Sequence, residues 1–136
     1  MTGSPRWLSR LVVDAIHYDQ ITSHGGVPGI RDEAVLDSAL ARPQQIFACG
    51  SGVDVTGLAA SYAYGLARNH PYHDGNKRIA FLAMAVFAEM NGYRFTAPEA
   101  DVVQWMLRLA AGDVDEEQLA KWVRTNLVDV GDGHST

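Results

Sequence analysis

Residues 58–84 read LAASYAYGLARNHPYHDGNKRIAFLAM, in which a polar segment separates two apolar stretches. The first stretch repeats apolar residues at three- and four-residue intervals, at Leu58, Ala59, Tyr62, Ala63 and Leu66. The second stretch continues beyond Met84 and does the same, at Ile79, Ala83, Val86, Phe87 and Met90. This spacing places apolar side chains along one face of a helix. We therefore predict one helix on each side of the polar segment.

Helical spacing also recurs before and after this stretch. Apolar stripes run through residues 8–16, 35–40, 102–110 and 119–127. Asp32 and Asp115 precede two of these stripes and are expected to cap the helices, and Pro43 is expected to end the helix that follows Asp32. Sustained two-residue alternation is absent from the sequence. The prediction is an all-α fold, one domain of about six helices over residues 1–136.

Two short regions stay open within this all-α prediction. A hairpin around Gly92-Tyr93-Arg94-Phe95, or one in the glycine-rich loop of residues 23–32, is compatible with the sequence. The tail DVGDGHST, residues 129–136, is expected to be disordered.

Composition limits the class of protein. The chain has 136 residues, 47% hydrophobic and 20% charged, which is typical of one soluble globular domain. Its net charge of −5 argues against broad electrostatic binding to nucleic acid or to an anionic membrane. The apolar runs are too short for a membrane span, and the single cysteine, Cys49, cannot form an internal disulfide. These properties predict a cytoplasmic protein that binds neither nucleic acid nor membrane.

The polar segment from His70 to Arg78 has the properties of an anion site. Pro71 disfavours helix at the preceding residue, and Gly75 permits a tight turn before the next helix begins. A helix start exposes unpaired N–H groups and the positive end of the helix dipole. Lys77 and Arg78 add two cations there, an unfavourable arrangement unless an anion binds. The sequence therefore predicts a bound phosphate at this helix start.

The same segment supplies a base and a metal ligand. His70 can accept a proton near neutral pH, which suits a general base acting on a hydroxyl. Asp74 offers a hard oxygen ligand of the kind that Mg²⁺ takes when it bridges nucleotide phosphates. Together with the phosphate site, these groups predict phosphoryl transfer.

Other interpretations of these residues stay open. Asp74 could be a turn residue only, and Lys77 and Arg78 could form a solvated helix face. A zinc-dependent hydrolase could use His70, His73 and Asp74, although the sequence has no second cluster of histidines and cysteines to complete the site. A partner-binding module without catalysis is the third alternative.

The segment HPYHDGNKR resembles the signature of Fic-domain proteins, HxFx(D/E)GNGRxxR. The flanking sequences HGGVPGIRDEAVLDSALARP, from His24, and EMNGY, from Glu89, resemble the Doc ("death on curing") branch of the Fic/Doc family. The resemblance extends from about His17 through the last predicted helix. It implies that the chain folds as a Fic/Doc helical bundle and that Tyr72, the aromatic residue of the signature, packs in the core.

The resemblance also implies roles for the site residues. His70 would be the general base that activates the target hydroxyl, and Asp74 would coordinate Mg²⁺. Gly75, Asn76 and the adjoining backbone would form the anion hole, and Arg78 would contact phosphate. ATP and Mg²⁺ are the cofactors that such a site implies.

Two departures from the Fic signature favour the Doc branch. Lys77 stands where the second glycine is expected, and Phe81 replaces the final arginine. Doc toxins transfer the γ-phosphate of ATP to elongation factor Tu and stop translation, so the resemblance implies a serine/threonine phosphotransferase with Lys77 in its nucleotide site. Gly75 is Fic-like, since Doc proteins usually have alanine there, and this leaves a Fic-type AMP transferase as the alternative. The Doc resemblance further implies a Phd-like antitoxin that folds onto the toxin and covers its active site.

Overall fold

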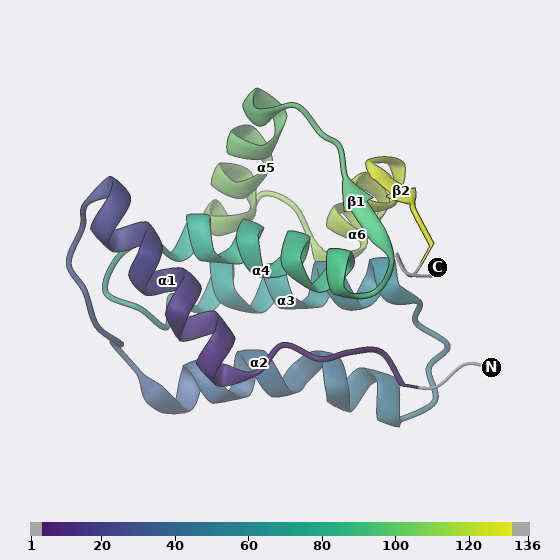
Figure 1. The fold of residues 1–136 in the computed structure, drawn as a ribbon, viewed down its shortest axis with the longest axis horizontal. Coiled ribbons are helices and arrows are strands. Elements are labelled where there is room, and N and C mark those ends of the chain that lie inside the picture. Colours follow the sequence, from purple (N-terminus) through teal and green to yellow (C-terminus); the bar gives the residue numbers. More distant parts are fainter. Residues whose placement is uncertain (1–3, 132–136) are drawn as a thin grey trace.

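A computed structural model describes residues 4–131, which form six helices and a small two-stranded sheet (Figure 1). The helices are α1 (Arg10–His24), α2 (Glu33–Ala48), α3 (Val55–Asn69), α4 (Asn76–Met90), α5 (Glu99–Ala111) and α6 (Glu116–Thr125). The strands are β1 (Tyr93–Phe95) and β2 (Leu127–Asp129). The predicted all-α bundle of about six helices is confirmed. None of the helices in residues 4–131 combines the length and the apolar character needed to cross a membrane.

Helix α3 lies at the centre of the bundle, in contact with α2, α4, α5 and α6 (Figure 1). Most of its residues are buried, many of them alanines, because neighbouring helices cover it on several sides. A Cβ atom added at Gly65 would lie 3.3 Å from the Cβ of Ala39 on α2. Small residues therefore let α2 and α3 approach closely, and this packing makes α3 a rigid support for the segment that follows it.

Helix α1 packs across α4 (Figure 1). Its inward face buries Val13, His17 and Ile21, which recur every four residues, whereas Leu11 is 79% exposed. The buried row matches the helical period, and histidine is its one polar member. Helix α1 therefore carries a buried imidazole toward the start of α4.

Side chains cap the starts of four helices. Ser9, Asp32, Asp54 and Asp115 accept hydrogen bonds from main-chain N–H groups in the first turns of α1, α2, α3 and α6. The caps predicted at Asp32 and Asp115 are confirmed. Helices α4 and α5 have no side-chain cap, because Gly75 and Pro98 stand at their cap positions, but the first turn of α5 contains Glu99 and Asp101 whereas that of α4 contains no acidic residue.

Pro43 does not end α2, contrary to the prediction. The helix continues to Ala48 with the proline inside it and buried. A proline in a helix interior costs roughly 3 kcal/mol. Packing of the residues beyond it offsets this cost: Ile46 contacts the core, and the ring of Phe47 meets Trp7 edge-on at 5.6 Å.

The strand at residues 93–95 exists, but its partner is not a neighbouring segment. β1 pairs antiparallel with β2 near the end of the chain, with Tyr93 opposite Asp129. The Val130 N–H also bonds to the Gly92 carbonyl at 2.9 Å. The predicted disorder of residues 129–136 is therefore wrong at its first residues, and residues 132–136 lie outside the described part of the chain. In the glycine-rich loop, the structure has an isolated bridge between Ile30 and Tyr72 instead of a hairpin.

Candidate active site

The segment from His70 to Gly75 turns the chain from α3 into α4. His70 ends α3 in the left-handed conformation, at φ 48°, and Gly75 begins α4 at φ 77°. His70 is the one non-glycine residue with positive φ in residues 4–131, and such backbone conformations cost roughly 1 kcal/mol or more. Its side chain is exposed and makes no hydrogen bond to a described residue. The strained turn thus presents a free imidazole at the surface beside the start of α4.

Arg31, in the loop before α2, holds the end of α3. Its Nε atom donates to the His70 carbonyl at 2.6 Å, and Nη2 donates to the Asn69 carbonyl at 2.8 Å. Its main-chain N–H bonds to the Pro71 carbonyl at 2.7 Å. A guanidinium at a helix C-terminus satisfies carbonyls that the helix leaves unpaired. Arg31 therefore stabilises the backbone that carries His70, a role for which the sequence has no local signal.

Asp74 is exposed but held at two points. Its main-chain carbonyl lies 2.8 Å from Nε2 of His17, and its Oδ2 atom accepts a hydrogen bond from the Val27 N–H at 3.0 Å. A Cβ added at Gly26 would lie 3.2 Å from the Cβ of Asp74, so the loop after α1 lies directly against this residue. The Oδ1 atom accepts no hydrogen bond from the described residues and is available to a cation.

Asn76 braces the turn with its side chain. Its amide oxygen accepts from the Tyr72 N–H at 3.0 Å, and its amide nitrogen donates to the Tyr72 carbonyl at 2.9 Å. Both side-chain groups are thus engaged within the turn. The part of Asn76 that can contribute to the expected anion hole is its main-chain N–H.

The start of α4 has unpaired donors and no acidic residue. Within residues 4–131, the N–H groups of Asn76, Lys77 and Arg78 have no hydrogen-bond partner, and the ladder begins at Ile79, which bonds to Gly75. The first turn contains no aspartate or glutamate. Neither Lys77 nor Arg78 forms an ion pair with a described residue. The start of α4 therefore has the unpaired donors and the cations that the predicted anion site requires, and anion binding there stays a prediction.

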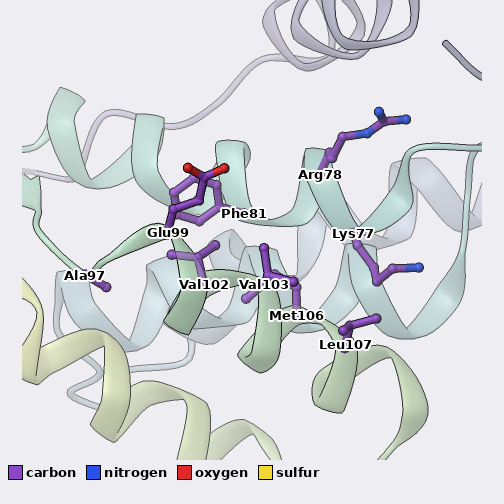
Figure 2. Close-up of a pocket in the computed structure, with 9 residues that line it drawn as sticks. All are labelled: Lys77, Arg78, Phe81, Ala97, Glu99, Val102, Val103, Met106 and Leu107. Carbon is purple, nitrogen blue, oxygen red and sulfur yellow. The ribbon is translucent and has the colours of Figure 1, made fainter. Parts of the chain in front are cut away.

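The two cations diverge from this helix start (Figure 2). Arg78 extends away from the groove described below, and its Nη2 atom lies 3.3 Å from the Gly25 carbonyl, on the side of the loop that contacts Asp74. Lys77 extends in another direction, and its ammonium group points away from the apolar residues of the groove (Figure 2). The Arg78 side chain thus lies near Gly75 and near the loop after α1 that contacts Asp74, whereas Lys77 lies at the edge of the groove.

A groove of about 450 Å³ adjoins this helix start, between α4 and α5. Its lining is mostly apolar, with charges at its borders: Lys77, Arg78, Phe81, Ala97, Glu99, Val102, Val103, Met106 and Leu107 (Figure 2). Val103 and Leu107 are 49% and 47% exposed. Phe81, which replaces the last arginine of the Fic signature, contributes to this apolar wall.

Tyr72 is buried, as the resemblance implied, and anchors the turn to α1. The His17 ring stacks on it with centroids 3.7 Å apart and planes 11° from parallel. Its hydroxyl donates to Asp14 at 2.8 Å. Burial raises the pKa of the Tyr72 hydroxyl, and the hydrogen bond to Asp14 is the second cause of this increase. The hydroxyl therefore stays protonated and remains a donor. Asp14 in turn pairs with Arg10 at 2.8 Å.

His70, His73 and Asp74, the residues of the zinc alternative, are not placed to bind one metal ion together. Within residues 4–131, no three side chains of histidine, cysteine, aspartate or glutamate are placed to hold a metal ion together. A protein zinc site needs at least three such ligands. A Mg²⁺ site has a lower requirement, because Mg²⁺ commonly takes one or two carboxylates and completes its shell with phosphate and water.

Comparison with known proteins shows the family of the chain. Residues 7–88 match the model of the Fic/DOC family. The chain is 30% identical to "Protein kinase doc" of Escherichia phage P1 over 112 residues, which is 81% of this chain and 86% of that protein. It is 37% identical to "Toxin Doc" of Mycolicibacterium smegmatis over 102 residues, 71% of this chain and 76% of the relative. The chain therefore belongs to the Fic/Doc family. Within that family it falls in the Doc branch.

Proposed function

We propose that this protein is a Doc-like toxin that transfers the γ-phosphate of ATP to a serine or threonine hydroxyl of a protein target. The observation that carries the proposal is the uncapped, cationic start of α4, which follows directly after an exposed histidine and an anchored aspartate. The Doc relatives, one of them named a protein kinase, support the same reaction class.

The chain's own residues have distinct parts in the proposed reaction. The imidazole of His70 accepts the proton of the target hydroxyl as that oxygen bonds to the γ-phosphorus. The bond from the γ-phosphorus to the bridging oxygen breaks, and ADP leaves. The N–H groups of residues 76–78 and the Arg78 guanidinium hold the phosphate oxygens and offset their charge. Lys77, at the groove edge, supplies a second cation to the nucleotide.

Mg²⁺ fits the donors at this site. Asp74 has one carboxylate oxygen engaged by the Val27 N–H and a second free of the described residues. A single hard oxygen next to a phosphate site is a usual protein contribution to Mg²⁺ binding. When bound, Mg²⁺ neutralises charge on the phosphates.

The choice of transferred group depends on Lys77 and Phe81. An apolar Phe81 in the groove wall cannot donate to a phosphate, whereas the Fic signature has an arginine there. We therefore favour γ-phosphate transfer, with elongation factor Tu as the target that the Doc resemblance suggests. Gly75, at the cap position of α4 with φ 77°, matches the Fic signature. AMP transfer, the reaction of Fic-type enzymes, is therefore the alternative.

We further propose a Phd-like antitoxin as the partner, with its segment in the groove between α4 and α5. An amphipathic helix fits an apolar groove of this kind, and the exposed Val103 and Leu107 offer anchors. Lys77 at the border would pair with an acidic residue of that segment. A bound segment there would lie over the nucleotide site and inhibit the enzyme.

The proposed reaction is tested by mass spectrometry of elongation factor Tu after incubation with the protein, ATP and Mg²⁺. A phosphate-sized mass gain supports the kinase, and an AMP-sized gain supports the nucleotidyl transferase. Labelled ATP added to a cell lysate extends the test to other targets. If neither assay shows transfer, the protein is a binding module and the proposal of catalysis is wrong.

A further inference from the structure

We infer that His17 is a positioning residue of the phosphotransfer site, which acts by fixing the main chain of Asp74. The inference rests on the function proposed above and extends it to a residue of α1, outside the signature segment. His17 contacts Asp74 across 57 positions of sequence.

The burial of His17 requires a hydrogen-bond partner. The residue is 4% exposed and lies between Val13 and Ile21 in the apolar row of α1. An apolar side chain at this position would extend the row, and a buried imidazole without a partner would be costly. Its Nε2 atom lies 2.8 Å from the Asp74 carbonyl oxygen. The ring nitrogen that would be costly to bury without a partner is therefore hydrogen-bonded to Asp74, the proposed Mg²⁺ ligand.

The geometry determines the direction of this hydrogen bond. A main-chain carbonyl can only accept, so Nε2 of His17 carries the hydrogen and donates it. Stacking on Tyr72 fixes the plane of the imidazole, and the bond from Tyr72 to Asp14 fixes the tyrosine. The donor is thus held in place by side chains of α1 and of the turn itself.

The imidazole packs directly beside the turn. A Cβ added at Gly75 would lie 3.4 Å from Nε2 of His17, which is van der Waals contact. With the Val27 N–H on its carboxylate, Asp74 is then held through both its main chain and its side chain. This double anchoring directs the remaining carboxylate oxygen outward, as a second shell of contacts orients a metal ligand.

Three variants separate this role from a contribution to stability. His17→Phe keeps a ring that can stack on Tyr72 but removes the N–H donor. His17→Gln supplies an amide N–H near the position of Nε2 without the ring. Val123→Ala, at a buried position of α6, removes buried methyl groups and is the control for reduced stability.

Two measurements on the whole protein are needed. Calorimetric titration with Mg²⁺, in the presence of a non-hydrolysable ATP analogue, gives the metal affinity. Amide hydrogen exchange of the protein without nucleotide reports the order of residues 72–76. For His17→Phe we expect Mg²⁺ binding to weaken about tenfold and exchange in residues 72–76 to speed up. His17→Gln should recover most of both, and Val123→Ala should change neither selectively.

The inference is overturned if His17→Phe matches Val123→Ala in both Mg²⁺ affinity and exchange of residues 72–76. It is also overturned if His17→Gln is as impaired as His17→Phe, because the donor would then not matter. Absence of nucleotide binding by the unmodified protein would instead refute the proposed function. The exchange measurement needs no nucleotide, so it still decides whether His17 anchors Asp74.

Discussion

Helices α4 and α6 begin in opposite ways. At α6, Asp115 accepts from the Gln118 N–H at 2.8 Å, and the Gln118 side chain accepts from the Asp115 N–H at 2.9 Å. Two glutamates follow in the first turn of α6. At α4, a glycine occupies the cap position, the first turn has no acid, and two cations are present. The helix dipole favours acidic residues and disfavours cations at a helix start, typically by about 0.3–1 kcal/mol per charge.

The start of α6 is thus satisfied within the protein, whereas the start of α4 keeps unpaired donors and cations for the phosphate that we propose binds there. We therefore expect substitutions at the two helix starts to affect different properties of the protein. Changes at the start of α6 should lower stability and leave activity intact. Changes at the start of α4 and in the turn before it should lower activity, with little loss of stability or even a gain.

The largest effect is expected at the turn before α4. His70→Ala should reduce phosphotransfer by roughly 10²–10⁴-fold, since a general base is lost. Its melting temperature should stay close to that of the unmodified protein, because the exposed imidazole makes no described hydrogen bond. Transfer of labelled phosphate and thermal unfolding measure the two quantities. Wild-type activity in this variant would show that another group acts as the base.

Arg78→Ala should weaken ATP binding by about tenfold or more, because a hydrogen bond to a charged group contributes roughly 1.5–3 kcal/mol. Arg94→Ala, in the exposed position of β1, removes the same charge from another surface and should have no such effect. Titration calorimetry with ATP and Mg²⁺ compares the two variants. Equal affinities would place the phosphates away from the start of α4.

Asp115→Ala should lower the free energy of unfolding by about 1 kcal/mol, the usual cost of losing an N-cap, and should leave phosphotransfer unchanged. Urea denaturation followed by circular dichroism measures the stability. A clear loss of activity in the folded variant would mean that α6 contributes to the site, and the contrast between the two helix starts would not hold.

The smallest expected effect is a gain in stability. Lys77→Glu introduces an acid into the first turn of α4 and should raise the free energy of unfolding by about 0.3–1 kcal/mol, while ATP binding falls. Lys121→Glu makes the same charge change within α6, away from its first turn, and serves as the control. If Lys77→Glu instead lowered the free energy of unfolding, Lys77 would have a structural partner, and its charge would contribute to stability as well as to nucleotide binding.

Local signals in the sequence predicted most of the helices and the position of the site. The apolar spacing indicated α3 and α4, Asp32 and Asp115 indicated helix starts, and Gly75 indicated the turn. Each of these signals acts over a few residues, within the helical period or a single hydrogen bond. The same local reasoning failed at Pro43, because contacts of Ile46 with the core and of Phe47 with Trp7 keep α2 intact beyond the proline.

The sequence therefore indicated the candidate chemistry of one short segment: a candidate base, a candidate metal ligand and a helix start with two cations and no side-chain cap. The tertiary structure alone revealed what holds that segment in place. His17 reaches Asp74 from α1, and Arg31 reaches His70 from the loop before α2. These contacts join residues far apart in sequence, and they depend on how α1 crosses α4 and how the loops lie against the turn. No spacing rule encodes such a contact, because the packing of whole helices determines which side chains meet.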